Sequence, residues 1–133
     1  MEPEVRGPEG RAPELIHADD QVAAVAEVLE RLCSKEEIPT QDVVVLSSHG
    51  TKNSRIYNEG LPGRFRLTDK RPPPAGKVHF SSIRGFKGLE SSVVVLCELE
   101  DLEDQTLGQQ LYVAFSRAKT HCVVVAPASE SGV

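Results

Sequence analysis

The sequence lacks a segment that could cross a membrane, because no apolar run approaches the roughly 20 residues that such a helix needs. It also lacks the basic and then apolar pattern of a secretory signal at its N-terminus. These absences predict a soluble, cytoplasmic protein with no membrane partner. With 133 residues, the chain has the length of one domain and can bury a core of its own.

Disulfide frameworks and metal sites also find little support in the sequence. The cysteines, Cys33, Cys97 and Cys122, are odd in number, lie in apolar runs and form no CxxC pair, which predicts reduced, buried thiols. The four histidines show no metal-ligand spacing. The segment 98–104 holds five carboxylates but lacks the spacing and the central glycine of a calcium loop. We interpret it as solvated surface and assign no metal to the chain.

The charge of the chain is unevenly distributed along the sequence. The net charge of −5 argues against a protein that coats nucleic acid through its overall field. Residues 1–51 hold 11 acidic and 4 basic residues, residues 52–87 hold 2 acidic and 9 basic residues, and residues 88–133 hold 7 acidic and 2 basic residues. The central third is therefore basic. It is either a binding surface or a solvated face that balances its acidic neighbours.

Hydrophobic periodicity predicts an α/β fold with a parallel sheet flanked by helices. Apolar residues recur at helical spacing over 20–34, with aspartates in place to cap the helix. The run Val43–Ser47 is typical of a strand covered on both faces. The remaining predicted elements are strands at 78–81, 93–97 and 122–126, an edge strand with a stiff connector within 60–76, and a helix over 107–118. Residues 1–14 read as a disordered lead-in or a linker, and 128–133 as a tail.

Two polar segments follow predicted strands, where ligands of open α/β sheets bind. The first, 48–55, carries Lys52 and Arg55 and could equally be an ordinary loop with a helix cap. The second, 81–90, has glycines that allow close backbone approach, the cations Arg84 and Lys87, and the carboxylate Glu90. This composition would suit an anionic polymer held beside a nucleotide.

The last predicted helix ends in Leu111–Lys119 and places Arg117 in its final turn, with Gln110 seven residues earlier on nearly the same face. A guanidinium on a rigid element suits bidentate contact with a phosphate. Alternatively, Arg117 and Lys119 only complement the negative end of the helix dipole.

Two stretches together resemble motifs of the UvrD/Rep-like superfamily 1 helicases. The segment Ser82–Glu90, followed by Val93–Leu96, resembles motif V, and Leu111–Lys119, leading into 122–126, resembles motif VI. The helix at 20–34 and the strand at 43–47 are similar to the segment that leads into motif IV. The resemblance implies that residues 15–127 form a C-terminal RecA-like domain with a three-layer, P-loop NTPase-like fold.

The resemblance also implies roles for individual residues. Arg117 matches the arginine that reaches the γ-phosphate of ATP, as a catalytic and cofactor-binding residue. Nucleotide contacts are further implied for Lys87, Gly88, Glu90 and Gln110. Contacts with single-stranded nucleic acid are expected for Ser82, Arg84, Lys52 and Arg55. The implied cofactor, ATP with Mg, would be shared with an N-terminal RecA-like domain, because the chain has neither a phosphate loop nor an acidic magnesium motif.

Departures from the family pattern leave the function open between two classes. Ser47 and Ser48 stand where many relatives carry an aromatic residue and an arginine, so a second phosphate-contacting arginine is missing unless Arg55 substitutes. The chain is therefore either the C-terminal motor half of an ATP-dependent DNA or RNA translocase, or a non-catalytic remnant that binds nucleic acid or protein. A small α/β ligand-binding domain would require both motif matches to be accidental.

Overall fold

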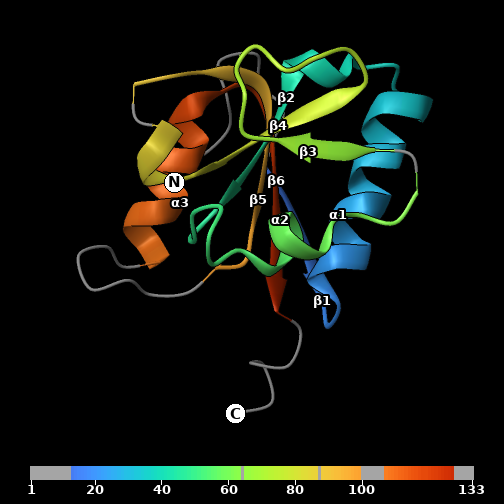
Figure 1. The fold of residues 1–133 in the computed structure, drawn as a ribbon. Coiled ribbons are helices and arrows are strands. Elements are labelled where there is room, and N and C mark those ends of the chain that lie inside the picture. Colours follow the sequence, from blue (N-terminus) through green and yellow to red (C-terminus); the bar gives the residue numbers. More distant parts are fainter. Residues whose placement is uncertain (1–12, 64, 87, 100–106, 128–133) are drawn as a thin grey trace.

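The computed structural model describes residues 13–63, 65–86, 88–99 and 107–127 (Figure 1). Most of the predicted lead-in, most of the acidic segment 98–104 and the predicted tail lie outside these residues, as does Lys87. In chain order the elements are β1 (Glu14–Ala18), α1 (Gln21–Glu30), η1 (Arg31–Lys35), η2 (Thr40–Asp42), β2 (Val43–Ser47), α2 (Arg55–Glu59), β3 (Arg66–Thr68), β4 (Lys77–Ser82), η3 (Arg84–Phe86), β5 (Ser91–Cys97), α3 (Leu107–Arg117) and β6 (Ala118–Pro127).

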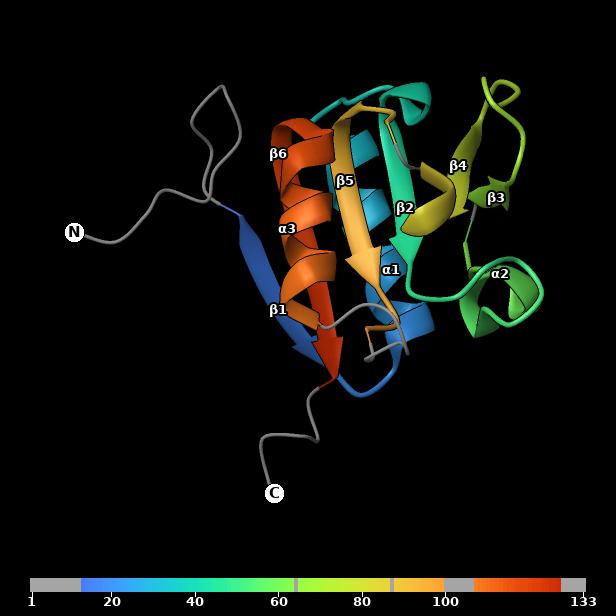
Figure 2. The ribbon, with the colours of Figure 1, turned by 90° about the vertical axis from the view of Figure 1, so that its left-hand side faces the viewer.

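One sheet of six strands forms the middle layer, in the order β1-β6-β5-β2-β4-β3. Every neighbouring pair is parallel. Helices α1 and α3 lie on opposite faces of this sheet (Figure 2). The predicted three-layer α/β fold is confirmed. The sheet has six strands, and the short strand expected within 60–76 is the edge strand β3.

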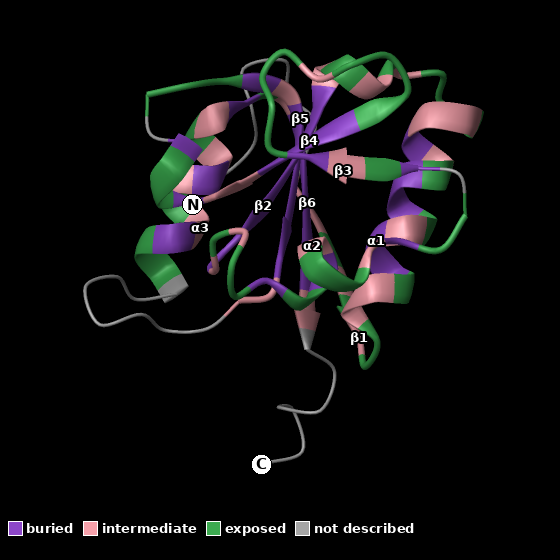
Figure 3. Cartoon of the chain, in the orientation of Figure 1, coloured by how far each residue is buried: buried purple, intermediate pink, exposed green. Residues whose placement is uncertain are grey.

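Strand β2 lies in the middle of the core, and all five of its residues are buried (Figure 3). Val43 and Val45 point into the apolar cluster beneath α1, whereas Val44 and Leu46 point into the cluster beneath α3. Because a parallel strand covered on both faces needs an apolar side chain at every position, the run was readable from the sequence. The predicted bounds of this strand are confirmed.

Helix α1 follows the prediction for residues 20–34. Asp20 caps its first turn, since the Asp20 carboxylate accepts a hydrogen bond from the Ala23 N–H at 3.1 Å. The helix buries Val25 and Leu29 against the sheet and continues into a π-helical turn, η1, that extends to Lys35.

Strand β1 is an element that the sequence analysis did not predict. Its residues alternate between half-buried and exposed, and Leu15 is 60% exposed, so its sequence has no apolar run. The Glu14 carboxylate holds the strand in place by accepting bonds from the Arg31 guanidinium at 2.5 and 2.8 Å and lying 3.1 Å from His121 Nε2. These contacts lower the pKa of Glu14 to about 2, chiefly through the Arg31 hydrogen bond.

The crossover segment, defined here as residues 83–90, connects β4 with β5 across the face of β2. Its apolar residues Ile83 and Phe86 are buried against Val44 and Leu46 in the cluster beneath α3. The Ile83 N–H donates to the Ser47 carbonyl at 2.9 Å, which fixes the start of the segment. This short segment therefore covers β2 on the face where a longer connection would place a helix.

Helix α3 ends at Arg117, and Ala118 and Lys119 belong to β6 and not to the helix. The predicted helix over 107–118 was therefore one residue too long. Strand β6 follows directly without a loop, so Arg117 lies at the junction between the helix and the sheet. The junction lies at the end of the sheet where the parallel strands begin, which we call the amino edge, and the opposite end, where they finish, is the carboxyl edge.

Candidate functional site

The pairing of β5 with β6 brings Glu90 and Arg117 to the same edge of the sheet. Ser91 is the register partner of Ala118, and the ladder shifts by one residue between Ser91 and Val93. Glu90 and Arg117, the residues that precede the two strands, therefore both stand where β5 and β6 begin. The two belong to different predicted motifs. Among the described residues, the buried Arg117 Nε has no hydrogen-bond partner. This atom is a donor that could still be satisfied by an added ligand or domain.

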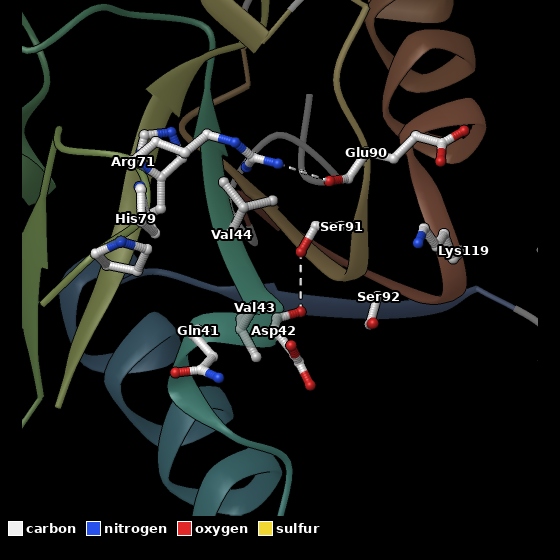
Figure 4. Close-up of a pocket in the computed structure, with 12 residues that line it drawn as sticks. Gln41, Asp42, Val43, Val44, Arg71, His79, Glu90, Ser91, Ser92 and Lys119 are labelled. Atoms are coloured by element: carbon white, nitrogen blue, oxygen red, sulfur yellow. Dashed lines mark hydrogen bonds between the residues drawn. The ribbon is translucent and has the colours of Figure 1, made fainter. Parts of the chain in front are cut away.

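An open pocket of about 450 Å³ lies at this amino edge, beside the starts of β2, β5 and β6 (Figure 4). Its polar lining combines the carboxylates of Asp42 and Glu90 with the cations of Arg71 and Lys119. The Ser91 hydroxyl donates to the Asp42 carbonyl at 2.8 Å and joins the starts of β5 and β2. A ligand with both phosphate and hydroxyl groups would find donors and acceptors here.

The predicted motif V residues lie in the crossover segment, which runs from the carboxyl edge, where β4 ends, to the amino edge, where β5 begins. Ser82 ends β4, and its Oγ accepts a hydrogen bond from the Gly85 N–H at 2.9 Å. A Cβ at Gly85 would stand 3.0 Å from the hydroxyl oxygens of both Ser81 and Ser82. Arg84 is exposed, and Gly88 has a φ of +79°, which favours glycine. Lys87, the other cation of this motif, lies outside the described residues.

Glu98, at the carboxyl end of β5, organises the opposite edge of the sheet. Its Oε1 accepts hydrogen bonds from the Ser47 hydroxyl at 2.6 Å and the Ser54 hydroxyl at 2.7 Å, and its Oε2 accepts from the Ile56 N–H at 3.0 Å. Its own N–H donates to Gln21 at 2.9 Å. Glu98 was expected to be one of the solvated carboxylates of segment 98–104, and that interpretation was wrong for this residue. The sequence feature that could have indicated this role is the position of Glu98 directly after the buried strand β5.

Gln110 is completely buried in α3, and its Oε1 accepts a hydrogen bond from the Ser48 hydroxyl at 2.5 Å. Ser48 directly follows β2, so this bond connects α3 to the carboxyl edge. Seven residues of helix separate Gln110 from Arg117, a rise of about 10 Å. The structure therefore does not bring the two side chains together, although both lie on one helix.

The remaining predicted cations also lie beyond the carboxyl end of β2. Lys52 is exposed in the connection to α2, and Arg55 begins that helix. The Arg55 Nε donates to Glu59 at 2.7 Å, which raises the pKa of Arg55. Arg55 lines a second pocket of about 240 Å³ with His49, Asn53 and other residues of this edge. Arg55 and Arg117 thus stand at opposite edges of the sheet.

The described cysteines are buried or half-buried, and none forms a disulfide. Burial raises the pKa of Cys122 to about 12 and that of Cys97 well above its usual value, so both thiols stay protonated at neutral pH. Within the part of the chain that the structure covers, no group of His, Cys, Asp and Glu side chains could hold a metal ion. None of the described helices combines the length and apolar character needed to cross a membrane.

Comparison with known proteins agrees with the two motifs. Residues 77–125, which include β4, the crossover segment, β5, α3 and most of β6, match the family of the UvrD-like helicase C-terminal domain. Among solved structures, the chain is similar to the C-terminal domain of a possible DNA helicase from Lactobacillus plantarum WCFS1. That match has a TM-score of 0.63 and 18% sequence identity, and it covers 95% of this chain and 81% of the other.

The structural match supports the fold alone at this level of identity. No curated protein matches the sequence. The resemblance to UvrD-like helicases, predicted from motifs V and VI, is confirmed over residues 77–125.

Proposed function

We propose that the chain is the C-terminal motor domain of a superfamily 1 ATP-dependent DNA or RNA helicase. In this function it supplies Arg117 and motif V to an ATP site that an N-terminal RecA-like domain completes. The observation that carries the proposal is the parallel pairing of β5 with β6, because Glu90 of one motif and Arg117 of the other precede these two strands at the same end of the sheet. The unpartnered Arg117 Nε supports it, because a buried donor at a domain edge is ready for an anionic ligand.

Within this proposal, ATP with Mg provides the phosphoryl group and the charge that neutralises its oxygens. Arg117 would hold its guanidinium against the phosphates and stabilise the charge that develops on them. Glu90 would accept hydrogen bonds from hydroxyl groups of the nucleotide, and Gly88 and Lys87 would lie in the same part of motif V. The phosphate loop and the magnesium ligands come from the other domain, because this sequence contains neither.

Nucleic acid binds at the carboxyl edge in this proposal. Ser82 and Arg84 end β4 and begin the crossover segment, and Lys52 and Arg55 follow β2. Hydroxyl groups and cations of this kind contact phosphates without reading the sequence of bases. The crossover segment, which runs from this edge to Glu90, gives the two sites a direct covalent connection.

A second candidate is a non-catalytic module that keeps the fold and binds nucleic acid or a protein. One observation favours it. The motif IV position where many relatives carry an arginine is Ser48, which is buried and bonded to Gln110. A domain with only Arg117 at the phosphates would support slower hydrolysis, or none.

ATP hydrolysis with a phosphate-loop domain tests the proposal. The chain is fused to or mixed with the N-terminal RecA-like domain of a superfamily 1 helicase, and ATP hydrolysis is measured with and without single-stranded oligonucleotide. We expect nucleic-acid-stimulated hydrolysis that falls about a thousandfold in Arg117→Ala. Ser116→Ala is the matched control, because this exposed neighbour bonds only the Val113 carbonyl among the contacts described.

The outcomes separate the two candidates. Hydrolysis that survives Arg117→Ala contradicts the role given to Arg117. Oligonucleotide binding without any stimulated hydrolysis by the wild-type chain favours the non-catalytic module.

A further inference from the structure

The Arg71 side chain, from the proline-rich connector, contacts two points of the crossover segment. Its guanidinium carbon, Cζ, lies 5.2 Å from the centroid of the Phe86 ring. Its Nη2 donates a hydrogen bond to the Glu90 carbonyl at 3.2 Å (Figure 4). Arg71 thus joins residues that stand before and after the turn of motif V.

Phe86 is a firm anchor for this contact. Its ring is fully buried beside Val44 and Leu46, so its position is fixed by the core. The His79 ring packs near it at 6.1 Å between centroids. A cation above such a ring is attracted by the negative face of its π-system.

The backbone next to Arg71 is also fixed. His79 Nδ1 lies 3.0 Å from the Lys70 carbonyl, which ties the connector to β4 one residue before Arg71. Since a carbonyl only accepts, this contact makes Nδ1 the donor. Burial lowers the pKa of His79, so the ring is neutral at physiological pH and this tautomer persists.

Among the described residues, those at the exposed end of this turn, 88–90, make few other contacts. Gly88 has a φ of +79°, and the Leu89 N–H donates to the Phe86 carbonyl at 3.0 Å. Gly88, Leu89 and Glu90 are all exposed, so the core does not hold them. The Arg71 hydrogen bond reaches this exposed half from the buried half.

We propose that Arg71 is a positioning residue for motif V, which holds the turn before Glu90 in the conformation that presents the motif to its ligands. The functional part of this inference rests on the proposed function, since that function makes motif V a ligand-binding segment. The structural part, that Arg71 orders the turn, stands on the contacts alone. The connector between β3 and β4 thereby becomes part of the site instead of a spacer.

Amide hydrogen exchange measured by NMR on the full chain tests the structural part. In Arg71→Ala, we expect the Leu89 amide to exchange about five- to thirtyfold faster, because a cation–π contact and a hydrogen bond are lost. Amides of β2 should keep their rates. Lys70→Ala is the control, because it removes the same charge one residue earlier and leaves the Arg71 contacts in place. An unchanged Leu89 rate in Arg71→Ala, or an equal acceleration in Lys70→Ala, overturns the inference.

Binding of a fluorescein-labelled oligo(dT) strand, followed by fluorescence anisotropy, tests the functional part. Arg71→Ala should weaken binding several-fold more than Lys70→Ala at the same salt concentration, and Arg71→Lys should recover part of the loss by keeping the cation on the ring. Equal weakening in the two alanine variants would show that Arg71 contributes only its charge, and this result overturns its positioning role. If the wild-type chain binds no oligonucleotide, the proposed nucleic-acid binding at the carboxyl edge fails, while the exchange rates still decide whether Arg71 orders the turn.

Discussion

Replacement of Glu98 with alanine should destabilise the domain by about 3 kcal/mol, a large part of the 5–15 kcal/mol that is usual for folded domains. The change removes three short hydrogen bonds, from Ser47, Ser54 and the Ile56 N–H. Both serines are fully buried, so their hydroxyl groups lose a partner without gaining water. Each unsatisfied group costs about 1 kcal/mol or more, and bonds to a carboxylate lie at the upper end of that range.

Urea unfolding at neutral pH, followed by circular dichroism, measures this loss. Glu98→Gln should cost less, about 1–2 kcal/mol, because its carbonyl can still accept from the serines while its amide cannot accept from Ile56. Glu59→Gln is the control, since its ion pair with Arg55 is exposed and adds little to stability. A loss below about 1 kcal/mol in Glu98→Ala would show that the network does not hold the carboxyl edge together.

Three further changes test other contacts. The pKa of Glu14 is lowered to about 2 from 4.5, so its ion pair stabilises the fold fully above about pH 5 and loses this effect as the pH falls toward 2. For a partly exposed pair we expect a contribution of about 1–2 kcal/mol. In urea unfolding, Glu14→Gln should remove this contribution from the difference in stability between pH 6 and pH 3. Ser48→Ala should cost about 1–2 kcal/mol in the same assay, because it leaves the buried Gln110 carbonyl without this donor, and a neutral result would contradict the bond. Arg84→Glu should weaken oligonucleotide binding at low salt and make the affinity less dependent on salt. If the substitution changes neither the affinity nor its salt dependence, Arg84 does not contact the nucleic acid.

Local signals predicted the centre of this fold well. Strand β2 has an apolar side chain at almost every position because both of its faces are covered, and Asp20 marks the start of α1 with a cap that the structure contains. The course of α3, with Arg117 in its final turn, followed to within one residue from the helical period of its apolar residues. In each case the pattern that carries the information lies within a short stretch of sequence.

The missed features depend on contacts between distant parts of the chain. The Glu98 carboxylate meets Ser47 and Ser54 across 51 and 44 residues, and Ser48 meets Gln110 across 62. No periodicity in the sequence encodes such pairs. Strand β1 was missed for a different reason, because this edge strand is short, exposes Leu15 and has only two adjacent apolar residues, which is too little for a strand pattern.

The order of the sheet explains why motifs V and VI are useful only as a pair. Strand β5 lies between β6 and β2, so the segments that enter β5 and β6 must arrive at the same edge. The crossover segment reaches β5 from the end of β4, and helix α3 leads into β6. Neither segment alone determines that Glu90 and Arg117 arrive at the same end of the sheet. Because Ser91 pairs with Ala118, the two approaches bring Glu90 and Arg117 to the same end of the sheet. A slip of two residues in this register would move the charges apart by about 7 Å while keeping every apolar side chain on its own face. The hydrophobic core alone therefore does not specify this register. The Thr120 hydroxyl, which donates to the Ser92 carbonyl at 2.6 Å, is one polar contact that does.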